Sequence, residues 1–173
     1  PVVIHGDGPH AVIVRAKDAA GNATGTKLAF TIDTTAPVVD LPPAPATPPT
    51  VTPNGDGSSE QVALSFSGSE PGTLAVSITN ASAKVVRTFA LPLAASKATL
   101  AWDGRTAAGT PVPDGRYTVT FSPTDIAGNP GGKVAEQVDV YAALVGVTRT
   151  PALFFPQDGD ALAATSKAAW TLR

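Results

Sequence analysis

The chain has 173 residues, a formal net charge of −2, 43% hydrophobic residues and only 6% aromatic ones. This length fits one domain or two small ones, and the core must rest mainly on Val, Ala, Leu and Ile. The sequence has no basic block, so it lacks the cluster of positive charge expected of a nucleic-acid-binding protein. It has no cysteine, so it cannot form disulfides. No stretch reaches the roughly 18 apolar residues of a membrane span.

The first predicted elements form a hairpin. Residues 9–17 alternate apolar and polar side chains over a β-branched run, which is typical of a half-buried strand. A turn at residues 18–22 separates this strand from a second one at residues 27–32. Five prolines then fall within residues 41–49. Such a run favours an extended, stiff spacer and predicts a domain boundary.

Short strands separated by turn residues follow the spacer. They are predicted at residues 61–67, 73–79, 85–90, 98–102, 116–122 and 133–141. Intervals of about 8–12 residues between strands are typical of a sandwich or a barrel. A short helix competes with strand structure only in the Ala-rich residues 160–169.

The alternation within these strands also predicts which side chains form the core. Alternate positions of a strand share one face, so residues 51–141 should fold alone as a seven-stranded sandwich. The predicted inward side chains are Val62, Leu64, Phe66, Val76, Ile78, Trp102, Tyr117, Val119 and Phe121.

An internal repeat sets the domain organisation. The residues Gly8, Val12, Asp18, Ala20, Gly21 and Asn22 recur without a gap as Gly115, Val119, Asp125, Ala127, Gly128 and Asn129. A second, weaker repeat relates residues 52–57 to residues 155–160. Both spacings slightly exceed 100 residues, the size of one immunoglobulin-like domain. The predicted fold is therefore all-β, with tandem immunoglobulin-like sandwiches. Residues 1–40 are predicted to be the last strands of one module and residues 41–50 to be a linker. Residues 51–141 are predicted to form a complete module, and residues 142–173 to begin a further one.

Several ordered motifs in residues 51–141 resemble the FlgD-type immunoglobulin-like module, named after the flagellar hook-capping protein. They are the entry Thr52-Pro-Asn-Gly-Asp-Gly57, the turn Trp102-Asp-Gly104, the loop Val112-Pro-Asp-Gly115 and the turn Asp125-Ile-Ala-Gly-Asn129. Residues 1–37 resemble the end of an adhesin-type bacterial repeat, and residues 150–173 resemble the entry of another FlgD-type module. The resemblance implies a bacterial protein that is extracellular or on the cell surface.

Acidic turns supply the candidate metal ligands, because calcium takes six to eight oxygen ligands. The candidates are Asn54, Asp56 and Glu60 in one loop, Asp18 with Asn22 and Asp125 with Asn129 in two equivalent turns, and Asp33. Asp33 precedes the spacer, where the resembled adhesin repeats often bind calcium between modules. The alternative is that these residues only cap the backbone of their own turns. Calcium is the one cofactor that the sequence predicts.

Trp102 has two interpretations: it covers one end of the core, which we favour, or it stacks on a sugar ring. The sequence shows no nucleophile–base pair and too few His and Cys residues for zinc, so we expect no catalysis. The leading function is a structural spacer whose partners are neighbouring modules of the same or adjacent chains. The alternatives are an adhesion module that binds cell-wall or extracellular polysaccharide, and a strand-exchanging subunit of an extracellular fibre.

Overall fold

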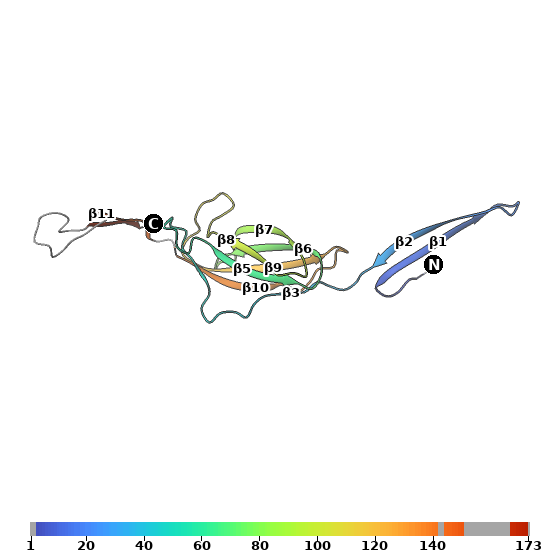
Figure 1. Cartoon of the computed structure of the whole chain (residues 1–173), viewed down its shortest axis with the longest axis horizontal. Helices are drawn as coiled ribbons and strands as arrows, with labels where there is room; N and C mark the ends of the chain where they lie inside the picture. The colour runs from blue at the N-terminus through green and yellow to red at the C-terminus, as the bar shows by residue number, and fades with distance from the viewer. Residues whose placement is uncertain (1–2, 142–143, 151–166, 173) are drawn as a thin grey trace, which may run out of the picture.

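The computed structural model describes residues 3–141, 144–150 and 167–172, and every regular element in them is a β-strand. The described residues contain no helix long and apolar enough to cross a membrane. A sandwich occupies the middle of the chain, with one hairpin at each end (Figure 1). The fold class is therefore the predicted one, an all-β protein with an immunoglobulin-like sandwich.

The sandwich consists of two sheets. The larger has the order β4 (Thr50–Val51), β10 (Val134–Val140), β9 (Gly115–Asp125), β6 (Gly72–Thr79) and β7 (Val85–Leu93). The smaller has the order β3 (Val39–Asp40), β5 (Val62–Gly68) and β8 (Ala98–Trp102). The pairing of β4 with β10 is parallel and the other pairings of the sandwich are antiparallel. The chain crosses repeatedly between sheets, as it does in immunoglobulin-like folds.

The core lies between these sheets and confirms the predicted inward face of each strand. All nine predicted core residues are buried, and none exceeds 6% exposure. The Phe66 and Phe121 rings meet across the two sheets with their centroids 5.8 Å apart. The Tyr117 hydroxyl donates a hydrogen bond to the Pro113 carbonyl oxygen at 2.7 Å, as in the tyrosine corner of many such sandwiches.

The proline-rich run does not separate domains, and this corrects the predicted boundary at residues 41–50. Strand β3 precedes the run, and its Val39 is 3% exposed and pairs with Gly68 of β5. Strand β4 follows the run in the other sheet, so the prolines form a crossover inside one sandwich. Proline cannot donate a ladder hydrogen bond, but it suits an extended connection between two sheets.

The two end hairpins lie outside the sandwich. In the first, β1 (Gly8–Lys17) pairs antiparallel with β2 (Ala23–Ile32), from Gly8 opposite Ile32 to Lys17 opposite Ala23. In the second, β11 (Leu144–Thr150) pairs antiparallel with β12 (Lys167–Leu172). The competing helix of residues 160–169 falls mostly outside the described residues, and its last three positions belong to β12.

Candidate metal centre

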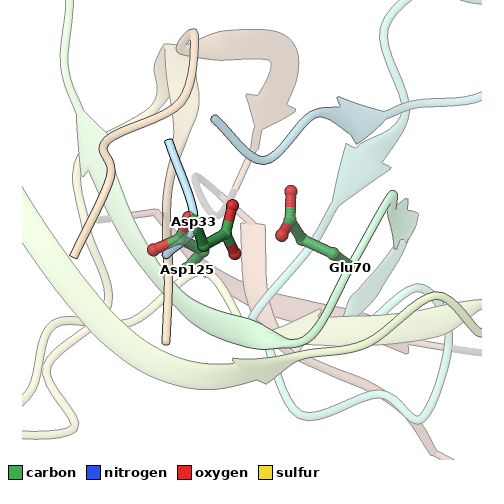
Figure 2. Close-up of side chains that lie close together, drawn as sticks. All are labelled: Asp33, Glu70 and Asp125. Carbon is green, nitrogen blue, oxygen red and sulfur yellow. The ribbon is translucent and has the colours of Figure 1, made fainter. Parts of the chain in front are cut away.

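Three carboxylates converge where the N-terminal hairpin joins the sandwich (Figure 2). Asp33 directly follows β2, Glu70 lies in the connection from β5 to β6, and Asp125 is the last residue of β9. One carboxylate oxygen from each lies within 4.8 Å of the other two. The cluster thus joins three segments that are far apart in the sequence.

The turn after β9 fixes Asp125 and connects it to the hairpin. The Asp125 carboxylate accepts hydrogen bonds from the Asn129 backbone N–H at 2.8 Å and from the Asn129 side-chain Nδ2 at 2.7 Å. The same Nδ2 donates to the Asp33 carbonyl oxygen at 3.0 Å. Asn129 therefore links the end of β9 to the segment that leaves β2, while Asp125 is only 6% exposed.

Close packing of two strands brings Glu70 to the same place. Gly72, two residues after Glu70, lies opposite Asp125 in the β6–β9 ladder. A Cβ atom at Gly72 would overlap the Thr124 carbonyl oxygen. Because glycine has no side chain, β6 can start against the end of β9 and bring the preceding Glu70 near Asp125.

The carboxylates of the cluster influence one another electrostatically. Desolvation raises the pKa of Glu70, and the negative charges of Asp33 and Asp125 raise it further. Burial alone would raise the pKa of Asp125, but the hydrogen bonds from Asn129 and the turn amides bring it below its usual value. Among the described residues Arg116 forms a salt bridge with Asp139, and no Lys or Arg of those residues is paired with Asp33, Glu70 or Asp125.

The raised pKa of Glu70 leads to a prediction for metal-free buffer. The folded chain holds the Glu70 proton more tightly than the unfolded chain does, so this carboxyl favours the folded state below its ordinary pKa of 4.5. That stabilisation is lost as the pH rises through the raised folded pKa. Glu70→Gln should therefore melt at a higher temperature than the wild type at pH 7 with EDTA, and at nearly the same temperature at pH 4. If the wild type melted at a higher temperature than the variant at pH 7, the ionised Glu70 would not destabilise the folded state, and the prediction would be wrong.

The donor set of the cluster suits a hard cation. Calcium is bound by oxygen atoms at about 2.3–2.6 Å, so two of its ligands can stand up to roughly 5 Å apart. The oxygens of Asp33, Glu70 and Asp125 lie within that separation. The three residues could hold calcium, with waters as further ligands, whereas nitrogen and sulfur ligands of the kind zinc prefers are absent from the cluster.

The candidate loop at residues 54–60 uses its side chains on its own backbone. The Asn54 Oδ1 accepts from the Asp56 backbone N–H at 3.0 Å, and the Asp56 Oδ1 accepts from the Ser58 N–H at 2.7 Å. The Glu60 Oε1 accepts from the Gly55 N–H at 2.6 Å. These contacts match the turn-capping alternative, and calcium binding by this loop stays a prediction.

The exposed turn at Asp18 has the same internal contacts as the turn at Asp125. The Asp18 carboxylate accepts from the Asn22 backbone N–H and from its Nδ2, both at 2.8 Å. No further carboxylate joins this turn among the described clusters. Of the eight residues predicted as calcium ligands, Asp33 and Asp125 belong to the carboxylate cluster and Asn129 donates hydrogen bonds to both, whereas Asp18 and Asn22 bond to each other. The sequence does not single out Glu70, which is a lone acidic residue between the predicted strands at residues 61–67 and 73–79.

Trp102 is a core residue, as the favoured interpretation predicted, and the alternative that it stacks on a sugar ring is wrong. Its side chain is fully buried, and its ring meets the Tyr117 ring edge-on at 5.4 Å between centroids. The indole Nε1 donates to the Arg105 carbonyl oxygen at 3.0 Å. A buried, hydrogen-bonded indole offers no face to a ligand. Trp102 was the one residue predicted to contact a polysaccharide, so that predicted partner has no candidate binding residue left.

Comparison with known proteins supports the resemblance of the central module. Residues 49–125 match the family model of the FlgD Ig-like domain. No curated protein matches the chain. The chain is similar to the crystal structure of dimeric latent PorU from Porphyromonas gingivalis, with 18% identity, 82% of this chain and 13% of that chain covered, and a TM-score of 0.45. It is also similar to FlgD from Xanthomonas campestris, with 27% identity, 65% and 74% coverage, and a TM-score of 0.44.

Proposed function

We propose that this chain is a non-catalytic structural part of a secreted or cell-surface bacterial protein, in which it holds neighbouring modules in a fixed arrangement. The observation that carries the proposal is the convergence of Asp33, from the hairpin side, on Glu70 and Asp125 of the sandwich. A cation bound by groups from both sides of a junction would hold the two sides together. The FlgD Ig-like match of residues 49–125 is consistent with such a role.

Calcium is the proposed cofactor of this junction. Bound to the three carboxylates, it would neutralise their repulsion and tie the segment after β2 to the ends of β9 and β5. Asn129 positions the site, because its side chain already holds the Asp125 carboxylate and the Asp33 carbonyl. The junction would then be flexible without the ion and rigid with it.

The two aspartates buried in the described sandwich, Asp139 and Asp125, have structural roles, which supports a non-catalytic function. Asp139 accepts two hydrogen bonds from the Arg116 guanidinium, at 2.8 and 2.9 Å, and Asp125 is held by its own turn. The surface hollow beside β5 is lined in part by Asp40, Ser65 and Lys97. No histidine lines this hollow, so none of its serines has an imidazole base beside it.

The cation proposal predicts a thermal shift. Calcium at about ten times its dissociation constant adds about 1.4 kcal/mol if only the folded state binds it. For a domain of this size the melting temperature should rise by roughly 5–10 °C between EDTA and about 5 mM calcium. Asp33→Asn and Glu70→Gln should abolish the shift, and Glu60→Gln should retain it. A shift that survives Glu70→Gln but disappears with Glu60→Gln would move the site to residues 54–60.

Small-angle scattering tests the mechanical part of the proposal. Calcium should narrow the distribution of intramolecular distances in the wild type, because the hairpin would stop moving relative to the sandwich. The same measurement on Asp33→Asn should show no change. If calcium raises the melting temperature without narrowing the distribution, the ion stabilises the sandwich but does not fix the junction.

A further inference from the structure

The N-terminal hairpin has the same construction as the β9–β10 hairpin of the sandwich. In the first, Gly8 lies opposite Ile32 and His10 opposite Phe30. In the second, the equivalent Gly115 lies opposite Val140, and Tyr117 opposite Val138. The sequence repeat of residues 8–22 is thus also a repeat of strand pairing, with one extra residue just before the second strand of the sandwich hairpin. Gly8 pairs with Ile32, 24 positions on, and Gly115 pairs with Val140, 25 positions on.

The turns of the two hairpins agree in backbone geometry. Gly21 and Gly128 have φ values of 90° and 96°, both in the left-handed region that favours glycine. The Asp18 N–H donates to the Asn22 carbonyl oxygen at 2.9 Å, and the Asp125 N–H donates to the Asn129 carbonyl oxygen at 3.1 Å. Strand register and turn therefore both identify β1–β2 as the counterpart of β9–β10.

The two faces of β1–β2 differ in character. One face carries His10, Val12, Val14, Leu28, Phe30 and Ile32. All three Lys and Arg residues of the two strands, Arg15, Lys17 and Lys27, are on the opposite face, whose one large apolar side chain is Ile13. This separation of charge leaves the first face suited to burial against an apolar surface.

The first face is open here, whereas its counterpart is covered. Val14 and Leu28 are each 63% exposed. In the sandwich, Phe121, the counterpart of Val14, is fully buried and meets Phe66 of the opposite sheet. Tyr117, the counterpart of His10, is covered by Trp102. The described structure thus contains this kind of hairpin twice, once with its apolar face exposed and once with that face covered by a second sheet.

We propose that the apolar face of β1–β2 docks the opening part of an immunoglobulin-like module, which is built like residues 38–114 and belongs to the same polypeptide. A sheet like β3–β5–β8 would cover the face, as it covers β9–β10. A strand like β6 would pair antiparallel with the free edge of β1, because β6 pairs in this way with β9. The hairpin is then the closing hairpin of a second sandwich. This inference rests on the proposed function as a structural part of a modular protein.

The proposal can be tested by adding the opening part of a module to the hairpin. A second copy of residues 38–114 is placed directly before Gly8 of the chain, so that Asp114 precedes Gly8 as it precedes Gly115. Hydrogen exchange should then slow at least a hundredfold in β1 and β2 and approach the rates of β9 and β10. Calorimetry should show a second cooperative transition. In the chain without the addition, the same amides should exchange rapidly, since a lone hairpin is marginally stable. Unchanged rapid exchange in the extended chain would overturn the proposal.

Two variants of the extended chain show which face is covered. Val12→Asp, on the apolar face, should remove the new protection and the second transition while the central module still melts as before. Lys27→Asp, on the opposite face, should leave both intact. Equal loss in the two variants would overturn the proposed orientation.

The remaining outcomes separate this proposal from its alternatives. Protection in the unextended chain that grows with concentration, with a dimer in sedimentation, would mean that a second copy covers the face, and would overturn the proposal. The calcium shift of the central module is measured in the same samples. If calcium does not shift the melting temperature but the hairpin is protected, the proposal that a cation stiffens the junction is wrong and the proposed docking surface is still supported.

Discussion

Replacing Trp102 by alanine should lower the free energy of unfolding of the sandwich by about 3–5 kcal/mol, a large part of the total for a domain of this size. The side chain is fully buried in β8, so its loss leaves a cavity between the sheets. The edge contact with Tyr117 and the hydrogen bond to the Arg105 carbonyl are lost with it. Urea unfolding followed by circular dichroism measures the change.

Two further variants separate volume from hydrogen bonding at this position. Trp102→Phe keeps an aromatic ring but leaves the Arg105 carbonyl without its donor, so its cost should fall well below that of alanine. Ile126→Ala, at a side chain that is 83% exposed, should change the stability by no more than about 0.5 kcal/mol. A Trp102→Ala cost as small as that of Ile126→Ala would mean that Trp102 does not seal the core.

The strands and the core could be predicted because their physical cause is local. A buried sandwich face requires an apolar side chain at every second position, and Val62, Leu64 and Phe66 show this in a single strand. Turn residues mark the ends of each strand in the same way. Strand β3 was missed because it has two residues beside a run of prolines, which is too short for a period to appear.

The candidate site was harder to predict because its residues meet only through tertiary structure. Asp125 and Asn129 were found because they belong to one repeated turn, and Asp33 through the resemblance to adhesin repeats. Glu70 depends on the close approach of Gly72 to the end of β9, which no local pattern in the sequence indicates. Conversely, the loop with Asn54 and Asp56 has a calcium-like composition, although the structure shows its side chains bonded to its own backbone.

Gly131→Ala should destabilise the sandwich by about 1–3 kcal/mol, the usual cost of an overpacked site. A Cβ atom at Gly131 would overlap the Pro37 carbonyl oxygen and press on the Pro123 ring. Pro37 is fully buried, and a backbone oxygen cannot rotate away as the end of a side chain can. The chain leading from Asp33 into the sandwich must therefore shift.

Gly132 provides the matched control, because nothing lies within 4 Å of a Cβ atom built there and its φ is not positive. Gly132→Ala should be neutral or should stabilise by up to about 1 kcal/mol, through the lower entropy of the unfolded chain. If both alanines cost the same, the effect belongs to the loop backbone in general and not to its contact with Pro37. If only Gly131→Ala destabilises and it also weakens the calcium shift, the Pro37 contact holds Asp33 at the carboxylate cluster. A calcium shift that stays intact in Gly131→Ala would show instead that Asp33 keeps its position without the Pro37 contact.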